Sequence, residues 1–279
     1  MEKASLTRNM IRLKEIDMFY FDTKADGPAI LCLHGRWGRA QAWYDFMQRY
    51  GAKYRVIAPD QRGHGLSGKP ISKYTSGEMA ADIAELTDEL HTGPVLLVGH
   101  SMGGRVAGHF AAAYPQKLKA LAILDVTANG TVNASELAPE QIPSVDPYTK
   151  DWPMPFASLM EAMTFIRQAE ESEFSYQHFL NSLTETPEGY QMMFSPQAIA
   201  ANIANSRGWF HLLPAISCPV LLVRSSSHLA IPDEDWVRMQ AQIPDCTAVE
   251  MSHPDHNVMQ ANKKEFYTCF DAFLKKVGM

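Results

Sequence analysis

Short apolar segments that alternate with segments of helical length constrain the fold of this chain more than any other feature. Apolar runs at residues 28–33, 94–99 and 118–124 are short and end at glycine or polar residues, as strands buried on both faces do. Amphipathic segments such as 76–90 and 263–277 have the spacing of helices. This alternation predicts an α/β fold with a mostly parallel, doubly wound sheet and helices on both faces.

Residues 127–210 interrupt this alternation. The segment has no strand-like run and is rich in Met, Phe, Tyr, Glu and Pro. We therefore predict an α/β core formed by residues 1–126 and 211–279, with residues 127–210 inserted as a helical cap. Ligand sites of parallel sheets lie at the carboxyl ends of the strands, so the cap is expected to cover that edge.

Composition and charge exclude several kinds of partner. The formal net charge of the 279 residues is −6 and there is no basic stripe, which argues against nucleic acid and against an anionic membrane surface. The cysteines (Cys32, Cys218, Cys246 and Cys269) form no C-x-x-C motif, and residues 1–15 have no apolar signal-peptide core. No apolar run is long enough to span a bilayer. These features predict reduced thiols and a cytoplasmic location.

The motif GHSMGG (99–104) carries the strongest chemical signal. It lies between an apolar strand-like run and a helical segment, which is typical of a nucleophile elbow. In so tight a turn, Gly99 and Gly103 are expected to avoid a clash between side chains. Ser101 would adopt a strained conformation with an exposed hydroxyl, and the N–H groups of the next helix would face any oxyanion formed there. Ser101 is the predicted catalytic nucleophile.

Two further motifs follow earlier strands, LHGRWG (33–38) and DQRGHGLS (60–67). Together with the elbow, and in this order, they make the chain outside the cap resemble the α/β-hydrolase fold family. The resemblance implies that the backbone N–H groups of Arg36 and Met102 form the oxyanion hole and that His34 is structural. The second motif is then expected to organise a loop rather than to catalyse.

The same resemblance implies a histidine base in the loop after the last strand, where the sequence reads MSHPDHNVMQ (251–260). His256, followed by Asn257, fits the family pattern better than His253. We therefore predict that His256 activates the serine hydroxyl as general base.

A serine–histidine pair also needs an acid that fixes the imidazole tautomer. The loop at 225–228, where most such enzymes carry an aspartate, has no carboxylate. Asp233 lies beyond it, where the next helix begins, and Asp255 adjoins His256, so its side chain is expected to diverge. Asp125 ends an earlier strand and preserves the chain order of nucleophile, acid and base. Some branches of the family carry the acid after this strand, so Asp125 is the predicted third member of the triad.

The predicted function is hydrolysis of a carboxylic ester, a lactone or a related acyl bond through an acyl-enzyme, without metal or cofactor. A C–C or amide-bond hydrolase on the same triad stays open, as does a ligand receptor or cofactor-free dioxygenase of the same fold. Members of the family that open epoxides or remove halides use aspartate at the elbow, so Ser101 excludes their chemistry. Dioxygenases often carry a second histidine where this chain has Met102, which counts against them.

The predicted substrate is a small molecule with an apolar or aromatic part. Trp37, beside the predicted oxyanion hole, and Trp152, in the aromatic-rich cap, are candidate substrate-binding residues. The side chain of Arg36 is expected to lie on the surface. In the alternative interpretation it turns into the pocket and binds a substrate carboxylate.

Overall fold

A computed structural model of the chain describes residues 4–130 and 136–279. Eight strands form one sheet: β1 (Thr7–Arg12), β2 (Asp17–Asp22), β3 (Ala29–Leu33), β4 (Arg55–Pro59), β5 (Val95–His100), β6 (Leu118–Leu124), β9 (Val220–Arg224) and β10 (Cys246–Glu250). Their order across the sheet is β1-β2-β4-β3-β5-β6-β9-β10. The pairs β1·β2 and β2·β4 are antiparallel, and the pairs from β4 to β10 are parallel. The predicted mostly parallel sheet is confirmed.

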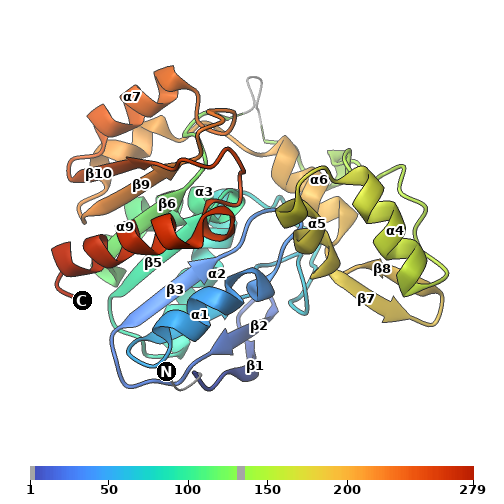
Figure 1. Cartoon of the computed structure of the whole chain (residues 1–279). Helices are drawn as coiled ribbons and strands as arrows, with labels where there is room; N and C mark the ends of the chain where they lie inside the picture. The colour runs from blue at the N-terminus through green and yellow to red at the C-terminus, as the bar shows by residue number, and fades with distance from the viewer. Residues whose placement is uncertain (1–3, 131–135) are drawn as a thin grey trace.

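Helices cover both faces of this sheet (Figure 1). The main helices of the core are α1 (Tyr44–Tyr50), α2 (Ser76–Glu89), α3 (Met102–Ala113), α7 (Asp233–Gln242), α8 (Val258–Ala261) and α9 (Lys263–Lys276). Short 3-10 turns lie between them: η1 (Ala40–Trp43), η2 (Pro115–Lys117), η3 (Pro139–Gln141) and η4 (Phe210–Ala215). Helices α1 and α9 pack on one face, and α2, α3 and α7 contribute to the hydrophobic cluster on the other.

The apolar runs are continuous because successive side chains of a strand enter different cores. In β3, Leu31 and Leu33 pack into the cluster beneath α2 and α3, whereas Ile30 and Cys32 pack into the cluster beneath α1 and α9. A strand that is solvated on one face would instead alternate apolar and polar residues. The sheet is therefore doubly wound, as its sequence predicts.

The segment between β6 and β9 packs as a lobe beside the sheet (Figure 1). It contains α4 (Leu159–Ala169), α5 (Glu173–Leu180) and α6 (Pro196–Ala204), and also a hairpin of β7 (Leu183–Thr186) and β8 (Gly189–Met192). The sequence analysis predicted no strand here. The hairpin was not predicted because its short strands are mostly half-buried or exposed and so lack an apolar run.

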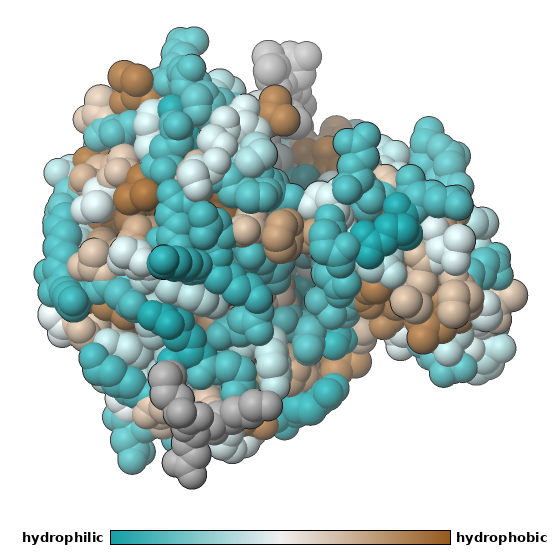
Figure 2. Space-filling view, viewed as in Figure 1, coloured by the Kyte–Doolittle hydropathy of each residue, from teal (hydrophilic) through white to brown (hydrophobic). Residues whose placement is uncertain are grey.

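The surface of the molecule is mostly hydrophilic on the face shown in Figure 2, with apolar side chains scattered over it. Among residues 4–130 and 136–279, no helix combines the length and the hydropathy that crossing a membrane requires. All four cysteines fall within these ranges and are free thiols.

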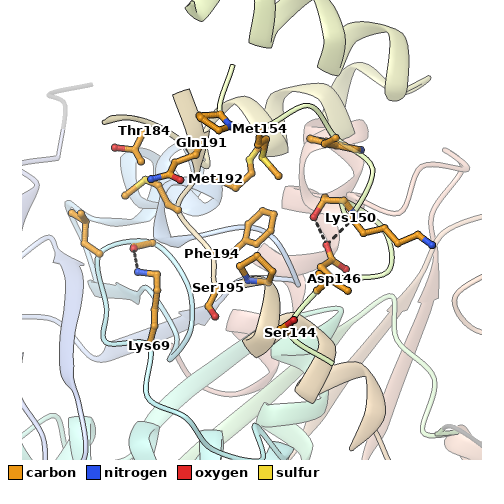
Figure 3. Close-up of a pocket in the computed structure, with 18 residues that line it drawn as sticks. Lys69, Ser144, Asp146, Lys150, Met154, Thr184, Gln191, Met192, Phe194 and Ser195 are labelled. Carbon is orange, nitrogen blue, oxygen red and sulfur yellow. Dashed lines mark hydrogen bonds between the residues drawn. The ribbon is translucent and has the colours of Figure 1, made fainter. Parts of the chain in front are cut away.

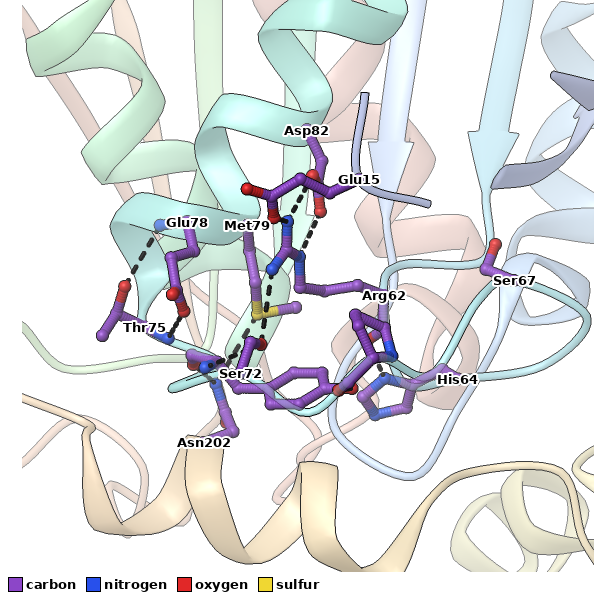
Figure 4. Close-up of polar contacts among 12 residues, drawn as sticks. Glu15, Arg62, His64, Ser67, Ser72, Thr75, Glu78, Met79, Asp82 and Asn202 are labelled. Atoms are coloured by element: carbon purple, nitrogen blue, oxygen red, sulfur yellow. Dashed lines mark hydrogen bonds and ion pairs between the residues drawn. The ribbon is translucent and has the colours of Figure 1, made fainter. Parts of the chain in front are cut away.

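The loop after β4 is held by two buried polar groups. The Asp60 carboxylate accepts the backbone N–H groups of Ala40 (2.7 Å) and Leu66 (2.8 Å). Arg62 forms ion pairs with Asp82 (2.5 Å) and with Glu15 (3.0 Å), as Figure 4 shows. Since these contacts tie the loop to α2 and to the N-terminal hairpin, they fit the expected loop-organising role.

Candidate active site

The turn between β5 and α3 holds Ser101 in a strained conformation. Its φ of 54° and ψ of −119° lie in a region that residues with a side chain rarely adopt. The Ser101 N–H donates to the Leu124 carbonyl (2.9 Å), and its own carbonyl accepts from Gly104 (2.9 Å). Because both sides of the turn are fixed, the serine is held at the carboxyl edge of the sheet.

Glycine is required at two positions of the elbow because a side chain would strike backbone. A Cβ on Gly99 would collide with the carbonyl group of Gly103, and one on Gly103 would collide with the carbonyl group of Leu33. The expected clash between side chains is therefore a clash with main-chain atoms. Such atoms belong to the sheet and to α3 and cannot move aside cheaply.

We expect Gly103→Ala to lower the free energy of unfolding by about 1–3 kcal/mol, since an overpacked rigid site costs that much. Urea denaturation, followed by circular dichroism, measures this change. The matched control is Gly77→Ala in α2, where the nearest atom, Thr75 Oγ1, would lie 3.9 Å from the new Cβ. The control should change stability by less than about 1 kcal/mol, and an equal loss in both variants would contradict the steric explanation.

Asp125 and His256 are joined by a hydrogen bond. Asp125 follows β6 directly and is 1% exposed, and its Oδ2 lies 2.8 Å from His256 Nδ1. Ser225 supports the same carboxylate through its backbone N–H (2.8 Å to Oδ1) and its hydroxyl (3.1 Å to Oδ2). The sequence analysis did not predict that Ser225 supports the Asp125 carboxylate. The signal was present, because Ser225 stands at the place where most such enzymes carry the acid.

The sheet order explains why Asp125 reaches the histidine. Strands β6 and β9 are parallel neighbours, and the Asp125 N–H donates to the Val223 carbonyl of β9 (2.8 Å). The ends of the two strands therefore meet, and an acid after either one can face the same place.

The other candidate acids are engaged elsewhere. Asp233 pairs with Arg224 (2.7 Å) and lies 3.1 Å from His228 Nδ1. Asp255 accepts the N–H of Asn257 (2.7 Å) and the hydroxyl of Ser172.

Two buried histidines, His100 and His34, follow core strands or end them, and only His100 contacts the candidate base. The ring of His100 lies 4.7 Å from that of His256, and His100 Nε2 donates to the His256 carbonyl (2.8 Å). His34 Nε2 accepts the Gln61 N–H (2.9 Å), so its Nδ1 donates to Gly35 (2.8 Å), which suits a structural role. Burial lowers the pKa of both His34 and His100 well below 6.5, so both rings are neutral.

A cavity of about 370 Å³ brings several predicted residues together. Ser101, Asp125 and His256 line it, and so do Arg36 and Met102. The Met102 side chain is buried, and its N–H is among those left free at the start of α3. The Arg36 side chain is half-buried and lines the cavity, so the expectation that it lies on the surface is wrong.

A smaller cavity of about 180 Å³ shares Ser101 and His256 with the first and is more aromatic. Trp37, a predicted binding residue, lines it, together with Tyr148 and Phe179 from the cap. The Trp37 indole N–H donates to Asp146 (2.9 Å), which holds the ring in place.

Three polar cap residues at this smaller cavity, His178, Tyr148 and Glu170, were not predicted from the sequence. His178 Nε2 donates to the Arg36 carbonyl (2.8 Å), and the Tyr148 hydroxyl donates to Glu170 (2.7 Å). Burial raises the pKa of the Glu170 carboxyl. No motif surrounds these residues, because only the packing of the cap on the core brings them here.

Trp152 is not brought together with Ser101. It lines a different and larger cavity of about 740 Å³, whose wall includes Phe194, Ser195 and Lys69 (Figure 3). Its ring packs on Phe179, with centroids 4.9 Å apart. The structure thus supports Trp152 as a packing residue of the cap.

Fold and sequence together identify the class of protein. Residues 28–259 match the alpha/beta hydrolase fold family. The chain therefore belongs to the alpha/beta hydrolase fold family, and it is a hydrolase of that family.

One sequence relative and two solved structures are similar to this chain over most of their length. The 2-(acetamidomethylene)succinate hydrolase of Mesorhizobium japonicum is 29% identical over 252 residues, which cover 86% of this chain and 85% of that protein. A crystal structure of E-2-(acetamidomethylene)succinate hydrolase superposes with a TM-score of 0.82 at 22% identity, covering 97% of this chain and 100% of the other. A thermophilic esterase from Thermogutta terrifontis has a TM-score of 0.75 at 25% identity, covering 98% and 100%.

Proposed function

We propose that this protein is a serine hydrolase that cleaves a carboxylic ester, a lactone or a related acyl bond through an acyl-enzyme. Ser101 is the nucleophile, His256 the general base and Asp125 the residue that orients the base. The observation that carries the proposal is the 2.8 Å hydrogen bond between His256 Nδ1 and the Asp125 carboxylate, in a cavity that Ser101 also lines.

The proton positions follow from this hydrogen bond. An ionised carboxylate only accepts, so His256 Nδ1 carries the proton and Nε2 keeps a lone pair. In the proposed step, Nε2 takes the Ser101 proton while Oγ forms a bond to the carbonyl carbon. The carbonyl oxygen becomes an oxyanion, which the N–H groups of Arg36 and Met102 then bind. Asp125 stabilises the imidazolium formed meanwhile.

The tetrahedral intermediate then collapses. The bond to the leaving alkoxide breaks as His256 Nε2 returns the proton to that oxygen, and Ser101 is left acylated. Water attacks the acyl carbon with His256 again as base, which releases the acid and restores the serine hydroxyl. Each proton removed from a nucleophile is thus returned to a leaving group.

The smaller cavity supports a substrate with an apolar or aromatic part. Trp37, Tyr148 and Phe179 present aromatic rings beside Ser101 there. Stacked or edge-on contacts with such rings favour flat or aliphatic groups over charged ones.

A second candidate function is hydrolysis of an amide or C–C bond by the same triad. The 29% identity over 85% of a protein named 2-(acetamidomethylene)succinate hydrolase favours it. The step differs only in the leaving group, which His256 would protonate at nitrogen or carbon.

Pre-steady-state kinetics with 4-nitrophenyl acetate test the proposal. We expect a burst of 4-nitrophenol close to one equivalent per protein when deacylation is slower than acylation. Acid-quenched samples should show an acetyl group on the peptide that contains Ser101. A receptor or a dioxygenase of this fold would not cleave esters, lactones or amides. Such a protein should give neither the burst nor the acetylated peptide.

A further inference from the structure

Two arginines line the cavity of about 370 Å³ that contains Ser101. Arg36 comes from the loop after β3, and Arg105 lies one turn into α3. Both side chains are half-buried. Within residues 4–130 and 136–279, neither guanidinium forms an ion pair with a carboxylate. Two cations without carboxylate partners beside a nucleophile need an explanation.

In the part of the chain that the structure describes, the side chain that accepts hydrogen bonds from Arg36 is neutral. Its Nε and Nη2 donate to the side-chain oxygen of Asn202, at 3.1 and 3.0 Å. Asn202 projects from α6 toward Met79 (Figure 4), and its nitrogen donates to the Tyr74 carbonyl (3.1 Å), which turns its oxygen toward Arg36. The amide therefore orients the guanidinium but leaves its charge uncompensated.

Neutral groups also hold Arg105. Its Nη1 donates to the Arg207 carbonyl (3.0 Å) and its Nη2 donates to the Asn129 carbonyl. Arg62 and Arg224, which are more deeply buried, instead pair with carboxylates. The cavity arginines thus differ from the structural arginines of this chain.

The nearby acids are already occupied. The Asp125 carboxylate is bound by Ser225 and His256. Asp146 acts on Arg36 from a distance, but its oxygens accept from Trp37 and Thr149. Neither carboxylate is therefore free to turn toward the guanidinium groups.

The positive charge of Arg36 affects the pKa of Arg105. Burial lowers the pKa of Arg36 to about 10, and burial together with the positive charge of Arg36 lowers that of Arg105 to about 10. Both groups stay cationic at neutral pH and repel each other. An anion between them would relieve both the repulsion and the lost solvation.

We propose that Arg36 and Arg105 bind a carboxylate of the substrate, and that the protein acts on acyl compounds that carry a carboxylate a few bonds from the scissile group. This inference rests on the proposed serine hydrolase function and specifies its substrate class. A guanidinium presents paired N–H donors that match the two oxygens of a carboxylate. Arg36 then serves twice, through its amide at the oxyanion and through its side chain at the carboxylate.

The test compares two esters of equal chain length, 4-nitrophenyl hexanoate and 4-nitrophenyl hydrogen adipate, which differ in a terminal carboxylate. We expect kcat/KM of the wild type to be higher for the adipate. The ratio of kcat/KM for the adipate to kcat/KM for the hexanoate should fall about 10–100-fold in Arg105→Gln, because this is the loss in affinity expected when a charge-assisted hydrogen bond is removed. Arg36→Gln, which keeps the backbone amide, should lower the same ratio.

The matched control is Arg207→Gln, which removes an exposed positive charge next to the same cavity wall. We expect the adipate-to-hexanoate ratio of kcat/KM in this variant to match that of the wild type within about twofold, because exposed charges are screened by salt. If Arg105→Gln and Arg207→Gln shift the ratio equally, or if neither shifts it, the carboxylate site is refuted while the hydrolase proposal stands.

Binding without turnover separates the two proposals. Free adipate should raise the Tm of Ser101→Ala by mass action, and the double variant with Arg105→Gln should lose this shift. If the shift depends on Arg105 but Ser101 is never acylated, the anion site stands, while the hydrolase proposal and the substrate class that rests on it are overturned. Equal shifts with and without Arg105 would overturn the anion site.

Discussion

Replacing Ser101 with alanine is expected to lower the turnover of every hydrolysed substrate by about 10⁴–10⁶-fold, because loss of the nucleophile removes the covalent route. The fold should be retained. Within the described ranges, 4–130 and 136–279, the Ser101 side chain makes no capping hydrogen bond to α3, and the elbow is held through the backbone of Ser101. Steady-state kinetics at saturating substrate and thermal denaturation measure the two quantities.

The expected pattern is a lost activity with an unchanged or slightly raised Tm, because alanine tolerates the strained turn no worse than serine does. Activity within tenfold of the wild type would eliminate Ser101 as nucleophile. A large drop in Tm would instead show that the hydroxyl serves the fold.

The second large effect is expected from Asp125→Asn, which should lower turnover by about 10²–10⁴-fold. An asparagine keeps the shape of the carboxylate but offers an N–H as well as an oxygen to His256 Nδ1. The imidazole can then shift its proton to Nε2, which leaves no lone pair to accept the Ser101 proton. The imidazolium formed during attack also loses its negative partner. Steady-state kinetics, with kcat and KM measured for the same substrate in both proteins, check the loss.

Asp233→Asn is the matched control for this prediction. Asp233 follows the loop after β9, where the acid more commonly lies, and its carboxylate pairs with Arg224 and His228. Its side chain is 74% exposed. We expect turnover within about threefold of the wild type, since a substitution at an exposed ion pair changes little. If Asp233→Asn were the more damaging of the two, the triad would have to be reassigned.

Much of the core could be predicted because its determinants are local and periodic. Runs of four or five apolar residues form strands that are buried on both faces, and these continuous runs show in the sequence of β3, β5 and β9. The hairpin of β7 and β8 could not be predicted in this way. Its strands of four residues each pack mainly against each other and carry no apolar repeat.

The sequence by itself determined the sheet, the elbow and the three residues proposed as the triad. Each depends on a short motif or on the position of one residue at a strand end, so chain order carries the information. Asp125 was preferred to Asp233 and Asp255 because it directly follows a strand.

Only the tertiary structure decided which groups surround Ser101. The adjacency of β6 and β9 brings Ser225 to Asp125, although the two residues lie 100 positions apart. Asn202 reaches Arg36 across 166 positions. The first contact depends on the order of the strands in the core sheet, and the second on how the cap packs against the core. Such long-range packing leaves no periodic trace in either segment. The nucleophile can therefore be predicted from a short local motif, whereas the residues that surround it in the cavity are set by the tertiary structure.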